Sequence, residues 1–129
     1  MNYHLDTTFA IDWHHESPAI SDIQDEIIAG LHDVTYDALM ELEYFAVPRV
    51  DREKELAFAG LTALATMVPI TSSAARLAAA WLGRMDRRQR VRHFNDALIA
   101  AVTVTNGAVL LTGDKKTERV FPVRARVYS

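Results

Sequence analysis

Four acidic side chains stand where α/β proteins often build cation sites. Asp6 and Asp114 each end a short apolar segment, whereas Glu41 and Asp96 lie inside longer apolar ones. A carboxylate at the edge of a core is costly unless a cation or hydrogen bonds compensate it, and clustered carboxylates raise one another's pKa. A divalent ion between them would remove that cost. The residue types therefore predict a metal site suited to cleaving phosphodiester bonds.

The ligand chemistry indicates which metal such a site would take. The four acids offer oxygen only, without sulfur or paired histidines, and this favours a hard cation, Mg²⁺ or Mn²⁺. We expect Asp6, Asp96 and Asp114 to hold the ion. The ion would lower the pKa of a bound water and neutralise charge that grows on the phosphate. We expect Glu41 to orient or deprotonate the attacking water.

Two threonines lie close to the acids in the sequence. Thr8 follows Asp6 by two residues, and Thr112 precedes Asp114 by two. A hydroxyl that donates a hydrogen bond to a carboxylate fixes its orientation. We therefore expect Thr8 and Thr112 to hold the carboxylates in place.

Short strand-like segments alternate with helical patterns along the chain. The strand candidates are segments 2–5, 34–36, 68–70, 108–111 and 124–128. Strands separated by helices indicate a mainly parallel sheet with helices on both faces. In such a sheet the ligand site lies at the carboxyl ends of the strands. Asp6 and Asp114 are expected there, because each follows a strand.

The helical segments should bring the other two acids to the same rim. Asp37 can cap a helix that carries Glu41 and ends before Pro48, which cannot continue it. We expect Asn95 to cap a further helix whose first turn holds Asp96. An intervening helix that starts near residue 51 is expected to turn Leu56, Leu64 and Met67 inward.

The charges of the chain are unevenly distributed. The net charge is -3, but residues 1–48 hold ten acidic and no basic side chains, while residues 49–129 hold fourteen basic against seven acidic. The densest basic stretch runs from Arg84 to Arg92. A local positive field is needed to draw a phosphodiester substrate to an acidic centre. We expect the phosphate contacts to come from Arg87, Arg88, Arg90, Lys115 and Lys116. We expect His93, three residues before Asp96, to be a solvated side chain.

Length and composition favour a single domain of 129 residues. The chain has no cysteine, which excludes disulfides and zinc–thiolate sites. It begins without the basic start and apolar stretch of a signal peptide, and no apolar run reaches the ~20 residues that cross a bilayer. We expect a cytoplasmic protein.

The segments around the four acids resemble, in order and spacing, the signature blocks of PIN-domain ribonucleases, in particular VapC-type toxins of prokaryotic toxin–antitoxin modules. The resemblance spans nearly the whole chain, and its most specific block is the third. The blocks are Leu5-Asp6-Thr7-Thr8-Phe9, Leu39-Met40-Glu41-Leu42, Asp96-Ala97-Leu98-Ile99-Ala100-Ala101 and Leu110-Leu111-Thr112-Gly113-Asp114.

The resemblance implies a three-layer α/β/α sandwich and an endoribonuclease that depends on Mg²⁺ or Mn²⁺. It also implies a homodimer that is inhibited by a cognate antitoxin protein. Asp6, Glu41, Asp96 and Asp114 match the family's acidic positions, and Gly113 stands where Arg is frequent.

Two other classes of protein share parts of this pattern. A receiver-like signalling domain needs an acceptor Asp at the end of its central strand, and segment 68–71 offers none. A non-catalytic RNA-binding or scaffold module of the same fold is the stronger alternative. Metal-dependent cleavage of RNA separates it from a nuclease.

Overall fold

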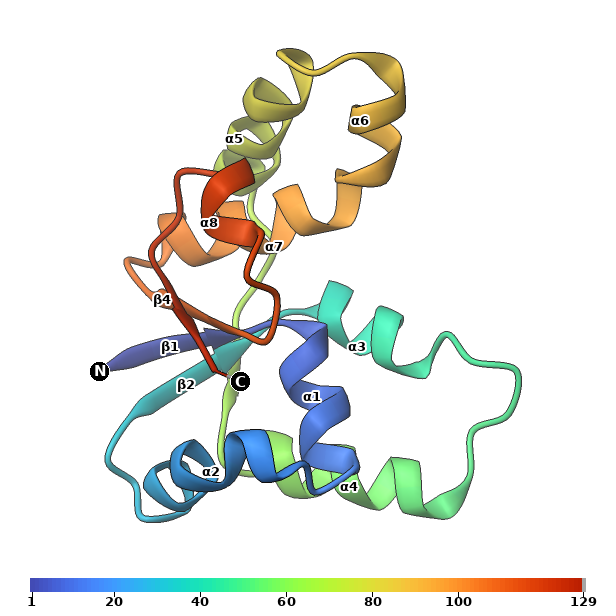
Figure 1. The fold of residues 1–129 in the computed structure, drawn as a ribbon, viewed down its shortest axis with the longest axis vertical. Coiled ribbons are helices and arrows are strands. Elements are labelled where there is room, and N and C mark those ends of the chain that lie inside the picture. Colours follow the sequence, from blue (N-terminus) through green and yellow to red (C-terminus); the bar gives the residue numbers. More distant parts are fainter. Residues whose placement is uncertain (129) are drawn as a thin grey trace.

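The computed structural model describes residues 1–128, and its centre is a sheet of five parallel strands (Figure 1). The strands in spatial order are β3 (Thr66–Met67), β2 (Asp33–Tyr36), β1 (Asn2–Leu5), β4 (Val109–Thr112) and β5 (Ala125–Val127). The register pairs Tyr3 with Val34 on one side and with Val109 on the other. The first strand of the chain therefore lies in the middle of the sheet.

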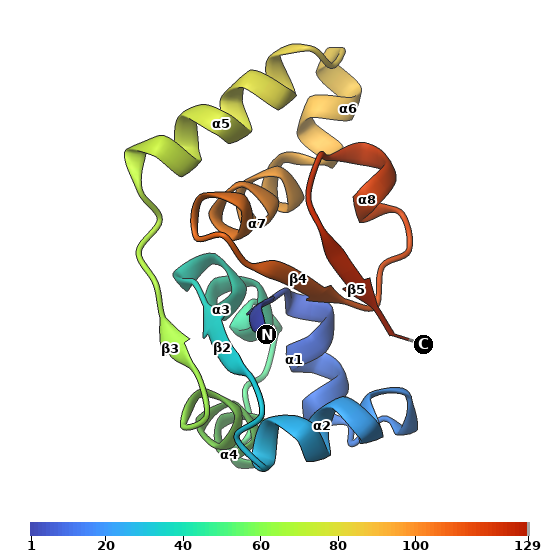
Figure 2. The same ribbon diagram turned by 90° about the vertical axis from the view of Figure 1, so that its left-hand side faces the viewer.

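Helices cover both faces of this sheet, as the two orthogonal views show (Figure 2). In chain order they are α1 (Thr7–His14), a 3₁₀ turn η1 (Pro18–Ile20), α2 (Ser21–Ile28), α3 (Ala38–Phe45), α4 (Arg52–Thr62), α5 (Ser72–Gly83), α6 (Arg87–Arg92), α7 (Phe94–Thr105) and α8 (Thr117–Val120). The predicted three-layer α/β/α sandwich with a parallel sheet is confirmed. None of the helices in residues 1–128 is long and apolar enough to cross a membrane.

Alternation along the strands divides the core into two clusters. On β1, Tyr3 and Leu5 face the cluster built with α1, α2 and α4. On β4, Leu111 joins this same cluster, while Leu110 faces the cluster built with α5 and α7. Successive side chains of a strand point to opposite faces, so a strand covered on both sides is apolar throughout. This burial fixes which strand ends reach the rim.

The helix after residue 51 forms, but its buried face differs from the predicted one. Phe58 and Leu61 are buried, at positions three apart on one side of α4. Leu56 and Leu64 are 58% and 40% exposed, and Met67, which lies on edge strand β3, is 48% exposed. The prediction that these three side chains turn inward is wrong. Helix α4 packs through Phe58 and Leu61, whereas Leu64 and Met67 lie beyond its end.

Some boundaries also shift. The third strand is Thr66–Met67 rather than segment 68–70, because the pairing with β2 ends at Met67. Val68 makes one last hydrogen bond, from its N–H to the Tyr36 carbonyl, and the chain then leaves the sheet. Helix α7 begins at Phe94 without a side-chain cap, so the predicted capping by Asn95 is wrong. The Asn95 side chain instead points to another helix, as described below.

Candidate metal and catalytic site

Asp6 occupies the centre of the candidate site because β1 ends directly before it. Its Oδ1 caps helix α1 by accepting from the backbone N–H of Phe9 at 3.1 Å. The same oxygen accepts from the Thr8 hydroxyl at 2.6 Å, and Oδ2 accepts from the Thr112 hydroxyl. The capping geometry and the two hydroxyls fix the carboxylate in one orientation.

The same threonines tie Asp6 to the turn after β4. The N–H of Gly113 donates to the Thr8 hydroxyl oxygen at 3.0 Å, and the N–H of Asp114 donates to the Thr112 hydroxyl oxygen at 3.0 Å. Each threonine thus links the turn to the Asp6 carboxylate. The structure places Asp6 and Asp114 on one rim, joined by Thr8 and Thr112.

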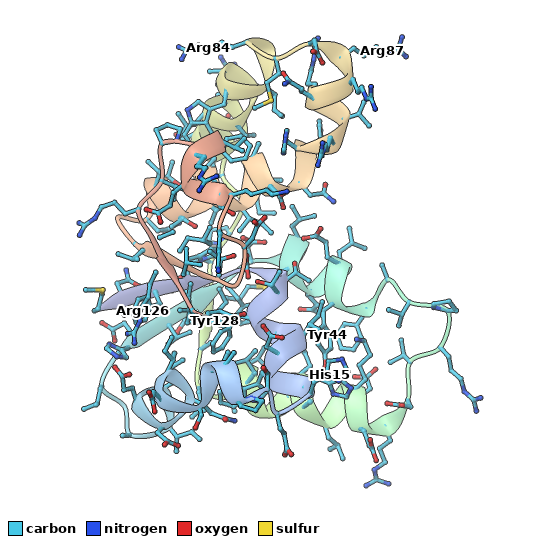
Figure 3. All side chains as sticks on the ribbon, in the orientation of Figure 1. His15, Tyr44, Arg84, Arg87, Arg126 and Tyr128 are labelled. Carbon is cyan, nitrogen blue, oxygen red and sulfur yellow. The ribbon has the colours of Figure 1, made fainter. Side chains whose placement is uncertain are left out.

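Tyr128, which is labelled in Figure 3, contacts this turn through its backbone and its ring. Its N–H donates to the Thr112 carbonyl at 3.2 Å, and its hydroxyl donates to Asp12 at 2.6 Å. A Cβ at position 113 would lie 3.2 Å from the Tyr128 hydroxyl oxygen. Gly113, which departs from the frequent Arg of the resembled family, leaves room for the tyrosine.

The opposite wall of the site comes from α7 and α3. Asp96 lies in the first turn of α7, and Glu43 lies in the last turn of α3. The Glu43 carboxylate accepts from the Thr7 hydroxyl at 2.7 Å and from the Asn95 side-chain amide at 3.3 Å. Glu43 is therefore held from α1 and α7 together.

The fourth acid of the cluster is Glu43, and the expectation for Glu41 is corrected. Glu41 lines a separate cavity with Leu42, Phe45 and Met67. Residues two apart on a helix are rotated by about 200° from each other, so the two glutamates cannot face the same side. In the sequence, Glu43 is marked only by its position next to the buried residues of α3. Glu41 borders the same residues on the opposite side, so this pattern does not distinguish the two glutamates.

The four carboxylates line one cleft with a volume of about 210 Å³. No salt bridge joins any of them to a basic side chain within residues 1–128. In the described part of the chain no three histidine or carboxylate side chains come close enough to enclose an ion unaided. Mg²⁺ commonly takes one or two carboxylates directly and keeps several waters. An oxygen-lined cleft with separated acids suits that mode of binding.

The electrostatics of the cleft disfavour the ionised forms of Asp6 and Asp96. Burial raises the pKa of Asp6, the hydrogen bonds from Thr112, Thr8 and Phe9 lower it, and the charge of Asp96 raises it further. Burial also raises the pKa of Asp96, although part of its side chain reaches solvent. Repulsion from Glu43 and Asp114 adds to that pKa shift, and His93 opposes it. A cation in the cleft would relieve both.

A buried pair anchors the strand ends behind the cleft. The Nε2 atom of His4 lies 2.7 Å from Asp37 Oδ2, and both side chains are fully buried. Asp37 Oδ1 caps α3 by accepting from the N–H groups of Leu39 and Met40. The pair thereby fixes the start of the helix that carries Glu43 at its other end.

The predicted phosphate-binding residues are placed at different distances from the cleft. Lys116 lines a cavity that borders the cleft, whereas Lys115 lines neither. Arg87 and Arg90 line another cavity with Val91 and Phe94. Figure 3 shows Arg87 pointing outward at the end of the molecule that is formed by α5 and α6. Arg88 is exposed on the same short helix.

Two basic groups that the prediction did not assign to the site line the cavity beside the carboxylates. They are Arg92, the last residue of α6, and His93, which links α6 to α7. Their signal in the sequence is their distance of three to four residues from Asp96. This spacing keeps them near the start of α7, whereas the arginines earlier in α6 point elsewhere.

Comparisons with known proteins identify the family and agree with the fold. A family model described as PIN domain matches residues 3–121. Similar solved structures include VapBC2 from Rickettsia felis bound to a promoter DNA fragment, with 14% identity, TM-score 0.81 and complete coverage of both chains. DNA-bound VapBC from Salmonella typhimurium has 16% identity, TM-score 0.74 and 98% coverage of both chains. VapBC-1 from nontypeable Haemophilus influenzae has 19% identity, TM-score 0.69 and the same coverage. No curated protein sequence matched the chain.

Proposed function

The chain belongs to the PIN domain family, and on that premise we propose that it is a metal-dependent endoribonuclease of the VapC toxin type. The observation that carries the proposal is the single cleft lined by Asp6, Glu43, Asp96 and Asp114, none of which forms a salt bridge with a basic side chain among residues 1–128. Burial and mutual repulsion raise the pKa values of Asp6 and Asp96, a cost that a bound cation would offset.

The donor set fits Mg²⁺ or Mn²⁺, which Asp6, Asp96 and Asp114 would hold. When bound, such an ion would act as a Lewis acid toward water and toward the phosphate. Thr8 and Thr112 keep the Asp6 oxygens directed into the cleft by donating to them. The chain itself therefore supplies a fixed carboxylate frame rather than flexible ligands.

Glu43 is the residue we assign to the attacking water. Both of its oxygens accept hydrogen bonds, from Thr7 and Asn95, so its orientation is set before substrate arrives. A carboxylate held in this way can orient a water and accept its proton. Glu41, on the other side of the same helix, takes no part.

Partners follow from the similar structures. Their names describe VapBC assemblies, so we propose that the chain pairs with a cognate antitoxin. We also propose, from the resemblance to VapC-type toxins alone, that it forms a homodimer. The proposed substrate is RNA, and a toxin that cleaves cellular RNA acts in the cytoplasm.

The test is to incubate the purified chain with a mixed RNA pool in Mg²⁺, in Mn²⁺ and in EDTA. We expect internal cleavage only with metal, and none from an Asp114→Asn variant purified in parallel. Binding of RNA without metal-dependent cleavage would instead identify a non-catalytic RNA-binding module of the same fold.

A further inference from the structure

A second cavity adjoins the carboxylate cleft and has a similar volume, about 210 Å³. The two cavities share Asp96, Asp114 and Thr117, so they meet at the acids. Its remaining walls come from the α6–α7 junction and from α8, and they consist of Arg92, His93, Lys116, Val120 and Phe121. We call this space the Arg92 cavity.

One wall of the Arg92 cavity is basic. No salt bridge engages Arg92 or Lys116 in the described residues, so their charges are available to a ligand. Lys116 is also fixed by its backbone, whose N–H donates to Asp114 Oδ1 at 2.9 Å. Two cations beside an acidic cleft would attract the phosphates that flank a bound scissile bond.

The other wall is apolar and firmly packed. Phe121 is buried and lies 5.5 Å from Trp81, measured between ring centroids. The His93 ring approaches Phe121 edge-on at 6.1 Å. Val120 completes this wall and stays partly exposed. A cavity with cations on one side and apolar and aromatic groups on the other matches a nucleotide, which carries a phosphate and a flat base.

We propose that the Arg92 cavity binds the nucleotide next to the scissile phosphate of single-stranded RNA. This inference rests on the proposed nuclease function, because it takes the carboxylate cleft as the place of cleavage. The cavities at Glu41, at Arg126 and at Arg87 share no residue with that cleft. Among the cavities compared in residues 1–128, the Arg92 cavity alone adjoins the cleft and offers a bound strand a path away from the acids.

Charge-matched variants of the full chain test the proposal. Arg92→Gln with Lys116→Gln removes both cations of the cavity. Arg49→Gln with Arg52→Gln removes the same charge from exposed positions that line neither cavity. The probe is a fluorescein-labelled single-stranded RNA of mixed sequence. Its Kd is measured in EDTA, where the nuclease is inactive, and KM and kcat are measured in Mn²⁺.

The expected size of the effect follows from counterion release. Each phosphate contact with a single strand contributes about 0.7 to the slope of log affinity against log salt. Losing two contacts should flatten the slope by about 1.4 and raise Kd roughly 25-fold at ~0.1 M salt. We expect the cavity variant to show this loss and the matched control to stay within about twofold of the native chain.

The outcomes separate the two proposals. Equal losses in the cavity variant and its control, in a native chain that cleaves RNA, would overturn the nucleotide site and leave the nuclease intact. A cavity-specific loss of binding in a chain that does not cleave would support the site and refute the nuclease. A native chain that neither binds nor cleaves RNA would refute both.

A second variant tests the apolar wall without changing charge. Val120→Trp fills the cavity, so we expect a raised KM and an altered choice of cleaved sequence, with an unchanged salt slope. Val91→Trp is the control, because Val91 is 74% exposed and lines the separate cavity at Arg87. Folding of each variant is checked by thermal melting. An unchanged pattern of cleavage sites in folded Val120→Trp would contradict base contact at this wall.

Discussion

Glu43→Gln should separate catalysis from stability, with Glu41→Gln as its control on the same helix. Gln keeps an oxygen that can accept from Thr7, but its amide would face the Asn95 amide, so the bond now measured at 3.3 Å is lost. One such bond near the surface is worth about 1 kcal/mol. The melting temperature should therefore fall by roughly 4 °C at most.

The loss in activity should be much larger than this loss in stability. Removing a carboxylate that orients or deprotonates water lowers a rate by roughly 10²- to 10⁴-fold, or about 3–5 kcal/mol of barrier. Glu41→Gln should leave the rate within about twofold, because Glu41 lines a different cavity with Leu42 and Met67.

The assay is Mn²⁺-dependent cleavage of a quenched fluorescent RNA by both variants, with circular dichroism melts of the same samples. A native rate in Glu43→Gln, or a greater loss in Glu41→Gln than in Glu43→Gln, would refute the assignment of Glu43 to the site.

Four further effects are expected. Asp96→Asn should abolish cleavage yet raise the melting temperature of metal-free protein. Because the pKa of Asp96 is raised in the folded state, its stabilising contribution is present below the ordinary value of 3.8 and is lost as pH rises through the folded pKa. The increase in melting temperature should therefore grow from pH ~4 upward, and an increase that shrinks with pH would contradict this. Millimolar Mn²⁺ should raise the native melting temperature more than an inert salt at equal ionic strength. Gly113→Ala should cost about 1–3 kcal/mol by urea unfolding, because its Cβ would crowd Tyr128, and Tyr128→Ala should relieve the added cost in the double variant. His4→Leu should cost about 1–3 kcal/mol by urea unfolding, because it leaves Oδ2 of the buried Asp37 without a donor, and an unchanged free energy of unfolding would contradict this.

The strand-end acids were predictable from the sequence because their positions depend on short-range rules. A buried apolar strand followed by Asp6 or Asp114 brings its acid to the carboxyl edge of a parallel sheet, whatever the details of packing. Thr8 and Thr112 lie two residues from these acids, close enough for local hydrogen bonds. The fold class followed from the same alternation of strands and helices.

The helical acid was not predictable in the same way. On α3 the buried stripe is formed by Met40 and Tyr44, and both Glu41 and Glu43 border it. Which border faces the strand ends depends on how α3 rotates against α1 and α7, which is a tertiary property. The apolar segment around Glu41, and then the resemblance, both pointed to Glu41. The contacts of Glu43 to Thr7 and Asn95 place Glu43 at the cleft instead.

For a related reason, the basic stretch does not by itself specify which arginines lie beside the acids. Its density in the sequence drew attention to Arg87, Arg88 and Arg90, but a helix of six residues distributes them over all sides. Only the end of that helix, at Arg92, reaches the cavity beside the acids. Charge density along a chain does not specify direction in space.

Direct measurement of Mn²⁺ binding by titration calorimetry tests the central claim, that the carboxylates of this cleft together hold a divalent ion. The native chain and Glu41→Gln should bind Mn²⁺ alike, whereas Asp6→Asn, Asp96→Asn and Asp114→Asn should each bind it at least about tenfold more weakly while remaining folded. Equal Mn²⁺ affinity in the native chain and the three folded aspartate variants would contradict the claim.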